Sequence, residues 1–136
     1  MNSGPDIVLV VDDDLAVRES LKFALELEGL VVHACGSGME LLRHPDLSRA
    51  RCLVLDYRMP VIDGLEVMEH LRALQVALPV ILITSAATDA LRERASKAGV
   101  CHVVEKPLSD SALLENIHDL LGIPSQAVTD PPRFST

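Results

Sequence analysis

Five short, mostly apolar runs alternate with five segments of helical periodicity along the chain, and no other feature limits its fold as strongly. Unbroken apolar stretches of strand length are typical of strands that are covered by helices on both faces. Strands that alternate with helices predict an α/β domain built on a parallel sheet. The expected strands span residues 7–11, 31–35, 52–55, 80–83 and 100–104.

Helical segments fill the intervals between these runs. Apolar residues recur there every three or four positions, which predicts one buried face for each helix. Glycines follow three of the segments, as expected at helix ends, and the hydroxyl of Ser109 is placed to cap the last helix. The expected helices span residues 15–28, 38–43, 65–74, 89–98 and 109–122.

The domain organisation follows from length and from one change in composition. A chain of 136 residues is near the common size of a single domain, so we expect one core. Pro124, Pro131 and Pro132 lie among small polar residues after the last helical segment. We therefore expect a folded domain over residues 1–122 and a flexible tail or the start of a linker over 123–136.

Composition excludes several classes of function. The longest apolar runs are far shorter than the roughly 20 residues of a membrane span, and the N-terminus lacks a signal-peptide pattern, so we expect a cytoplasmic protein with no membrane association. The net charge of −8 argues against direct nucleic-acid binding by this segment. Cys35, Cys52 and Cys101 have no metal-binding spacing, and we expect all three to be reduced and buried.

Polar residues stand where the expected strands end. Asp12 and Asp13 follow the first strand, Asp56 follows the third, Thr84 the fourth and Lys106 the fifth. In an open parallel sheet the carboxyl ends of the strands share one edge, and ligands bind beside that edge. The sequence therefore predicts that these side chains meet in one site.

The residue types in this cluster indicate its chemistry. Crowded carboxylates repel one another, which raises the pKa of at least one of them unless a cation is present. Mg²⁺ is suited to the site because it binds oxygen ligands, and Asp13 and Asp56 are its candidate ligands. Lys106 and Thr84 could bind phosphoryl oxygens by charge and by hydrogen bond. Each residue taken alone has a simpler explanation as a cap, a turn residue or a surface charge, but together they predict a phosphoryl acceptor site.

At these motifs the chain resembles the receiver domains of bacterial response regulators, over residues 7–121. The acidic segment 8–14 is similar to the family's acidic pocket, and segment 55–60 with Asp63 and Gly64 is similar to its phosphoacceptor loop. Thr84 and the segment 105–107 follow in the family's order. The resemblance implies a flavodoxin-like (βα)5 fold with strand order 2-1-3-4-5 and helices on both faces of the sheet.

The resemblance also implies a role for each site residue. Asp56 would be the phosphoacceptor, Asp12 and Asp13 would hold Mg²⁺, and the bond before Pro107 would be cis. The expected metal ligands are Asp13, Asp56 and the backbone carbonyl of Arg58, with Asp12 completing the acidic pocket. The expected residues for phosphoryl binding and switching are Thr84, Lys106 and Val103. Val103 is atypical because it stands where the family commonly has an aromatic switch residue.

The implied partners and activity belong to two-component signalling. The phosphoryl donor would be a histidine kinase or a histidine phosphotransfer protein. The chain would act as a signalling phosphoacceptor that catalyses its own phosphorylation and a slow self-dephosphorylation. Its output would be a switch of the surface made by the fourth helix, fifth strand and fifth helix, which is also the expected surface of a homodimer.

Two alternative functions are considered beside this one. The first is a phosphatase of the haloacid-dehalogenase type with Asp12 as nucleophile and Asp14 as acid, which lacks support because no later acidic motif follows Lys106. The second is an adaptor of the same fold that works without phosphorylation. It is less favoured because every residue of the acceptor site is present.

Overall fold

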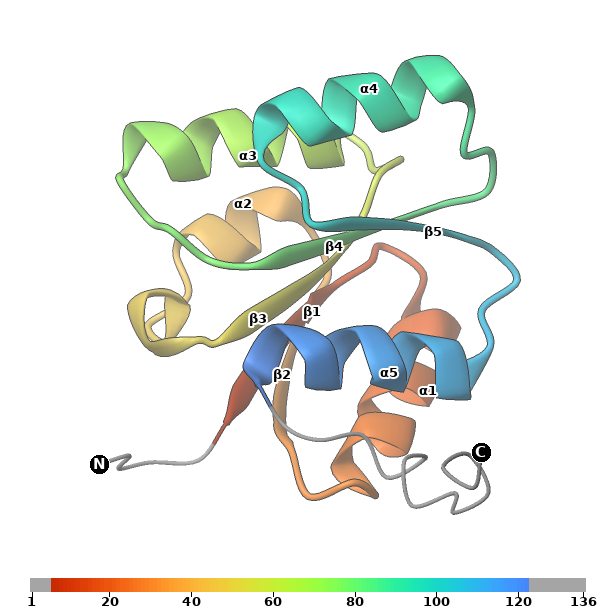
Figure 1. The fold of residues 1–136 in the computed structure, drawn as a ribbon. Helices are drawn as coiled ribbons and strands as arrows, with labels where there is room; N and C mark the ends of the chain where they lie inside the picture. Colours follow the sequence, from red (N-terminus) through yellow and green to blue (C-terminus); the bar gives the residue numbers. More distant parts are fainter. Residues whose placement is uncertain (1–5, 123–136) are drawn as a thin grey trace.

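A parallel five-stranded sheet lies between two layers of helices (Figure 1). The computed structural model describes residues 6–122 of the chain, apart from the side chain of Asp110. The strand order is β2-β1-β3-β4-β5, which confirms the predicted flavodoxin-like topology. The strands are β1 (Ile7–Val11), β2 (Val31–Cys35), β3 (Cys52–Asp56), β4 (Val80–Thr84) and β5 (His102–Glu105).

Helices cover both faces of this sheet, as the apolar strands predict. Figure 1 shows α2, α3 and α4 on one face and α1 and α5 on the other. The helices are α1 (Leu15–Glu26), α2 (Gly38–Leu42), α3 (Gly64–Ala73), α4 (Asp89–Ala98) and α5 (Asp110–Leu121), and a short 3-10 helix, η1 (Leu47–Arg49), follows α2. Among residues 6–122, none of the helices is both long enough and apolar enough to span a membrane.

Alternate residues of the strands enter two separate cores because successive side chains of a strand point to opposite faces. Leu9, Leu53 and Leu82 face the layer of α2, α3 and α4. Val8, Val54 and Ile81 face the layer of α1 and α5. The central strands are buried along their whole length, so their carboxyl ends are held rigidly at one edge of the sheet.

The helix boundaries follow the expected capping signals. Ser109 caps α5 by accepting a hydrogen bond from Ala112 N, as predicted, and Gly122 ends that helix with a positive φ of 74°. The first helix ends at Glu26 instead of residue 28, because Glu28 N and Gly29 N donate to carbonyls only three residues back. Gly29 then takes a φ of 87°, which a side chain would disfavour.

The fifth strand begins two residues later than predicted. The chain turns at Gly99, where φ is 97°, and Val100 N donates to Ala95 O at 3.0 Å. Val100 therefore belongs to the turn that caps the end of α4 and not to β5.

One prediction about the cysteines is wrong. Cys35 and Cys52 are buried as expected, and burial raises the pKa of their thiols to about 11 and about 12. Cys101 is exposed, because it lies in the turn before β5 and not within the strand. The expected tail or linker over 123–136 lies outside the described residues.

Candidate functional site

The carboxyl edge of the sheet gathers the predicted polar residues. Asp12 follows β1, Asp56 ends the adjacent strand β3, and Thr84 ends β4. These three side chains are buried, with exposed fractions of 2%, 5% and 3%. Buried polar groups are uncommon unless they are paired or functional, so this edge of the sheet is the candidate site.

Three carboxylates meet at this edge. One oxygen atom from each of Asp12, Asp13 and Asp56 lies within 4.8 Å of the others. Asp13 is exposed and the other two are buried, so the cluster opens to solvent on the Asp13 side. The cluster that the strand ends predicted is therefore assembled in the fold.

Lys106 supplies a positive charge beside the buried carboxylates. Its Nζ lies 3.5 Å from Asp56 Oδ1 and 3.7 Å from Asp12 Oδ2. Its backbone N donates to Thr84 O at 2.8 Å, which ties the β5–α5 connection to the end of β4. The Lys106–Pro107 peptide bond is cis, as the resemblance implied.

Electrostatics distinguish the buried carboxylates from ordinary ones. Burial raises the pKa of Asp56 to about 6, the charge of Asp12 adds to the rise, and Lys106 opposes it. Burial also raises the pKa of Asp12, against a lowering by the backbone N–H of Asp14 and by Lys106. The sequence predicted raised pKa values through mutual repulsion, and the larger cause is desolvation.

Asp12 has one oxygen that the protein leaves without a hydrogen bond. Its Oδ1 accepts a hydrogen bond from Asp14 N at 2.9 Å. Its Oδ2 is buried and has no hydrogen-bond partner among the described residues. A buried, unsatisfied carboxylate oxygen is costly, and a cation ligated directly or through water would satisfy it. The donor set of the cluster thus fits a hard divalent cation such as Mg²⁺.

Thr84 ends β4 next to this cluster, and Val103 lies on the neighbouring strand β5. The hydroxyl of Thr84 accepts from Ala86 N at 3.1 Å and donates to Ala86 O at 3.4 Å, so it is engaged in a local turn. Val103 pairs with Leu82 and packs partly buried against the core on the α4 side. The structure therefore places a small aliphatic side chain, not a ring, on the strand next to Thr84.

The sequence reasoning missed Arg18, and it named Gly64 only as part of a loop motif without giving it a role. Arg18 Nη1 donates to Asp12 O at 2.8 Å and holds the β1–α1 connection in place. The only signal for it was its position one helical turn after Asp14, which caps α1. Gly64 allows α3 to approach the end of β3, since a Cβ there would lie 2.8 Å from Asp56 O.

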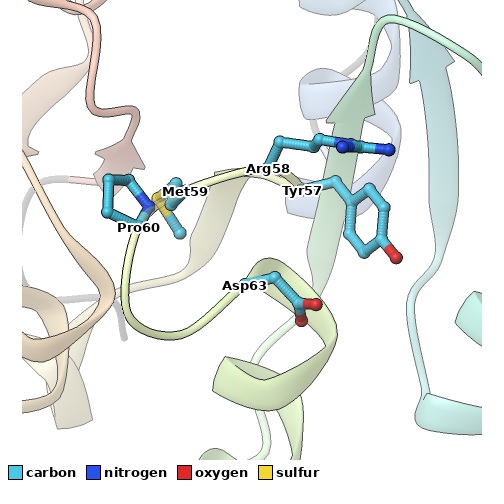
Figure 2. A pocket seen from close by; sticks show the side chains of 5 residues that line it. All are labelled: Tyr57, Arg58, Met59, Pro60 and Asp63. Atoms are coloured by element: carbon cyan, nitrogen blue, oxygen red, sulfur yellow. The ribbon is translucent and has the colours of Figure 1, made fainter.

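The loop after Asp56 lines a cavity of its own. Figure 2 shows Tyr57 and Arg58 at the start of this loop, Met59 and Pro60 farther along it, and Asp63 where it reaches α3. These residues line a cavity of about 520 Å³ whose lining does not include Asp12 or Asp56. The side chain of Asp63 caps α3 by accepting a hydrogen bond from Glu66 N at 2.9 Å, and Asp63 N donates in return to Glu66 Oε1 at 2.8 Å.

Comparisons with known proteins agree with this arrangement. A family model described as the response regulator receiver domain matches residues 8–118. Nodulation protein W of Bradyrhizobium diazoefficiens is 37% identical over 111 residues, which cover 82% of this chain and 49% of that protein. Response regulator MprA of Mycobacterium leprae is 40% identical over 116 residues, which cover 84% of this chain and 50% of that protein.

Solved structures show the same fold. A CheY-like response regulator receiver domain protein from Methanospirillum hungatei JF-1 superposes with a TM-score of 0.79 at 27% identity. The match covers 88% of this chain and 95% of that one. In contrast, this chain spans about half the length of the curated relatives it matches.

Proposed function

Since this chain belongs to the family of response regulator receiver domains, we propose that Asp56 is the residue that accepts the phosphoryl group in its signalling reaction. The observation that carries this assignment is the position of its carboxylate. Asp56 ends a central strand, is 5% exposed, and has Lys106 Nζ at 3.5 Å. Asp12 also stands at a strand end, but its carboxylate lies farther from Lys106 Nζ, at 3.7 Å, and Asp13 is exposed.

The proposal assigns the metal to the acidic pocket. Asp13, Asp56 and the backbone carbonyl of Arg58 would ligate Mg²⁺, and Asp12 would hold it through its unsatisfied Oδ2. When bound, Mg²⁺ would offset the charge of the carboxylates and of the incoming phosphoryl oxygens.

The transfer itself requires little covalent chemistry from the protein. The donor is a phosphohistidine on a histidine kinase or a histidine phosphotransfer protein. A carboxylate oxygen of Asp56 forms a bond to phosphorus, the bond from phosphorus to the donor's imidazole nitrogen breaks, and that nitrogen keeps the electron pair. Lys106 lies where its charge can neutralise a phosphoryl oxygen, and Thr84 can donate a hydrogen bond to another once it leaves its local turn.

The same residues support the loss of the phosphoryl group, which completes the cycle. Water attack on the acyl phosphate would restore the Asp56 carboxylate and release inorganic phosphate, which is the slow self-dephosphorylation expected of a receiver. The signal in between would be carried by α4, β5 and α5, and we propose this surface for a homodimer of the phosphorylated form.

The structure disfavours the phosphatase alternative. That mechanism needs Asp14 as an acid beside a nucleophilic Asp12. Asp14 is exposed instead, and its Oδ1 accepts hydrogen bonds from Ala16 N at 2.9 Å and Val17 N at 3.3 Å as the cap of α1. The adaptor alternative predicts no phosphorylation at all, so one experiment decides among the three.

We expect acetyl phosphate with Mg²⁺ to add one phosphoryl group to the protein, at Asp56. Intact-mass spectrometry of the wild type should show a single added phosphoryl group, and the Asp56→Asn variant should show none. Asp14→Asn serves as the matched control, because it removes a nearby carboxylate outside the buried cluster. Equal labelling of Asp56→Asn, or a phosphoryl group attached to Asp12, would contradict the assignment, and an unlabelled wild type would support the adaptor.

A further inference from the structure

A second group of metal-binding side chains lies on the opposite edge of the fold from β5. His33 is the central residue of β2, which is an edge strand of the sheet. His44 and Asp46 lie in the connection between α2 and η1. Residues 31, 33 and 35 share one face of β2 by strand alternation, and Val31 and Cys35 pack into the core on the α2 side. The three side chains therefore converge where that connection folds back onto the edge strand.

Their distances are close to those of a coordination site. One ligand atom from each residue lies within 4.8 Å of the other two. His33 Nε2 is already 3.4 Å from Asp46 Oδ2. Ligand bonds near 2.0 Å in a tetrahedron separate neighbouring ligand atoms by about 3.3 Å, so this pair needs almost no movement.

The second imidazole is held in a form that can bind a metal. His44 Nδ1 accepts a hydrogen bond from Asp46 N at 3.0 Å, so this nitrogen carries a lone pair and no proton. The ring centroids of His33 and His44 are 5.3 Å apart at an angle of 48°, which leaves the rings unstacked. A metal ion bound at Nδ1 would replace the backbone hydrogen bond.

An arginine orients the carboxylate from outside the group. Arg49 Nη2 lies 3.0 Å from Asp46 Oδ1, which leaves Oδ2 directed toward His33. Hydrogen bonds of this kind commonly fix metal-binding carboxylates. The side chain of Arg49 is 67% exposed, so water screens its repulsion of a bound cation.

From these contacts we propose that His33, His44 and Asp46 form a binding site for a divalent transition-metal ion, and that this ion is Zn²⁺. Two imidazoles and one carboxylate suit Zn²⁺ and are poorly suited to Mg²⁺, which binds oxygen ligands. Three protein ligands leave the fourth position of the ion to water. All three residues are partly buried, so the site is reachable from solvent.

The bound ion would stabilise the edge of the sheet. It would join β2 to a connection that is otherwise held there by the 3.4 Å contact between His33 and Asp46 and by the burial of Leu47. The unfolded chain has no preformed site, so the ion would bind only the folded protein. Such binding would raise the melting temperature.

The test is a Zn²⁺ titration of the full chain in excess Mg²⁺, in which calorimetry measures the binding. The excess Mg²⁺ is added to fill the acidic pocket, and an Asp13→Asn variant reports any Zn²⁺ that binds there instead. We expect one equivalent in the wild type and an affinity at least about tenfold weaker in His33→Gln, His44→Gln and Asp46→Asn. His70→Gln, on the exposed surface of α3, is the matched control and should bind as the wild type does. Co²⁺ in place of Zn²⁺ gives a visible absorption band that should be lost in the same three variants.

The outcomes separate this site from the acidic pocket. Binding that survives in His33→Gln and His44→Gln but is lost in Asp13→Asn would overturn the proposal, as would an equal loss in His70→Gln. Circular dichroism of each variant checks that it is folded, and the two histidine variants lie in different elements, so a folding defect in one leaves the other informative. Phosphorylation at Asp56 is a separate measurement, so failure of either proposal leaves the other testable.

Discussion

At the scale of single residues, the buried carboxylate of Asp56 places a charge where water is excluded. Burial raises its pKa from 3.8 to about 6, with Asp12 as the second cause. A raised pKa in the folded state means that the protonated form is preferred by the fold. The extra stability of that form is present below the unfolded pKa of 3.8 and is lost as the pH rises through about 6.

We therefore expect Asp56→Asn to stabilise the metal-free protein at neutral pH. The pKa difference between 3.8 and about 6 corresponds to an upper limit of about 3 kcal/mol in the free energy of unfolding. Urea unfolding in EDTA between about pH 4 and pH 8 should show the gap between variant and wild type opening as the pH rises to about 6. Mg²⁺ should then narrow the gap by binding the wild type. Equal midpoints for the two proteins at neutral pH would show that Asp56 is not buried as described.

Val61 is a strained residue in the loop after Asp56. Its φ is 72°, in the left-handed region that β-branched residues avoid, and its side chain is 89% exposed. Val61→Gly should raise the free energy of unfolding by about 1 kcal/mol, because relief of the strain exceeds the entropy that glycine adds to the unfolded chain. Urea midpoints measure the change. Val61→Ala is the control and should gain less, and a lower midpoint for Val61→Gly would argue against strain.

At the scale of elements, α4 contacts both the loop after Asp56 and the strand β5. Arg94 Nη1 donates to Tyr57 Oη at 3.3 Å, and Arg92 Nη1 donates to Val103 O at 3.4 Å. Thr84 lies just before this helix and is held by Ala86. Movement of Thr84 toward a phosphoryl group would break that turn and shift the start of α4. The small side chain of Val103 would rearrange at the same time, in place of the rotation of an aromatic ring.

We expect beryllofluoride, a stable mimic of the phosphoryl group, to shift the amide NMR signals of α4 and β5 in the wild type. A hydroxyl bonded to a charged group contributes about 1.5–3 kcal/mol, which is enough to bias a two-state loop. Thr84→Val should keep the shifts near Asp56 and reduce those in α4. If the distant shifts persist in Thr84→Val, or if wild-type shifts stay near Asp56, the signal takes another route.

At the scale of the whole molecule, both cores are completed by residues up to Leu121. Leu113, Ile117 and Leu121 of α5 are buried against the sheet, and Arg51 Nη2 donates to Leu121 O at 3.2 Å. We propose on this ground that residues 1–122 form the receiver unit.

A chain ending at Gly122 should keep the melting temperature of the 136-residue chain, because it retains both described cores. A chain ending at Ser109 is the contrasting variant. Each buried aliphatic side chain lost with α5 removes about 2–5 kcal/mol, and three such losses come to about 6–15 kcal/mol, comparable to the roughly 5–15 kcal/mol that stabilise most domains. Calorimetry should show one cooperative transition for the first chain and none for the second. A clear drop in melting temperature for the first chain would move the domain boundary.

The sequence by itself determined the order of elements, the parallel sheet and the residues of the acidic site. These follow from local signals: apolar runs of strand length, caps such as Ser109, and polar residues directly after strands. Because parallel strands end at one edge, Asp12, Asp56 and Lys106 could be predicted to meet without knowing any distance. Only strand and helix ends, such as the start of β5, shifted by a few residues.

The tertiary structure alone decided what depends on how connections fold back. It left Cys101 exposed, placed Arg18 on the carbonyl of Asp12, and made desolvation the main cause of the raised pKa of Asp56. It also brought His44 and Asp46 against the edge strand that holds His33. No periodicity marks such contacts, because they join an irregular connection to a strand, and their distances are set by the packing of the whole chain.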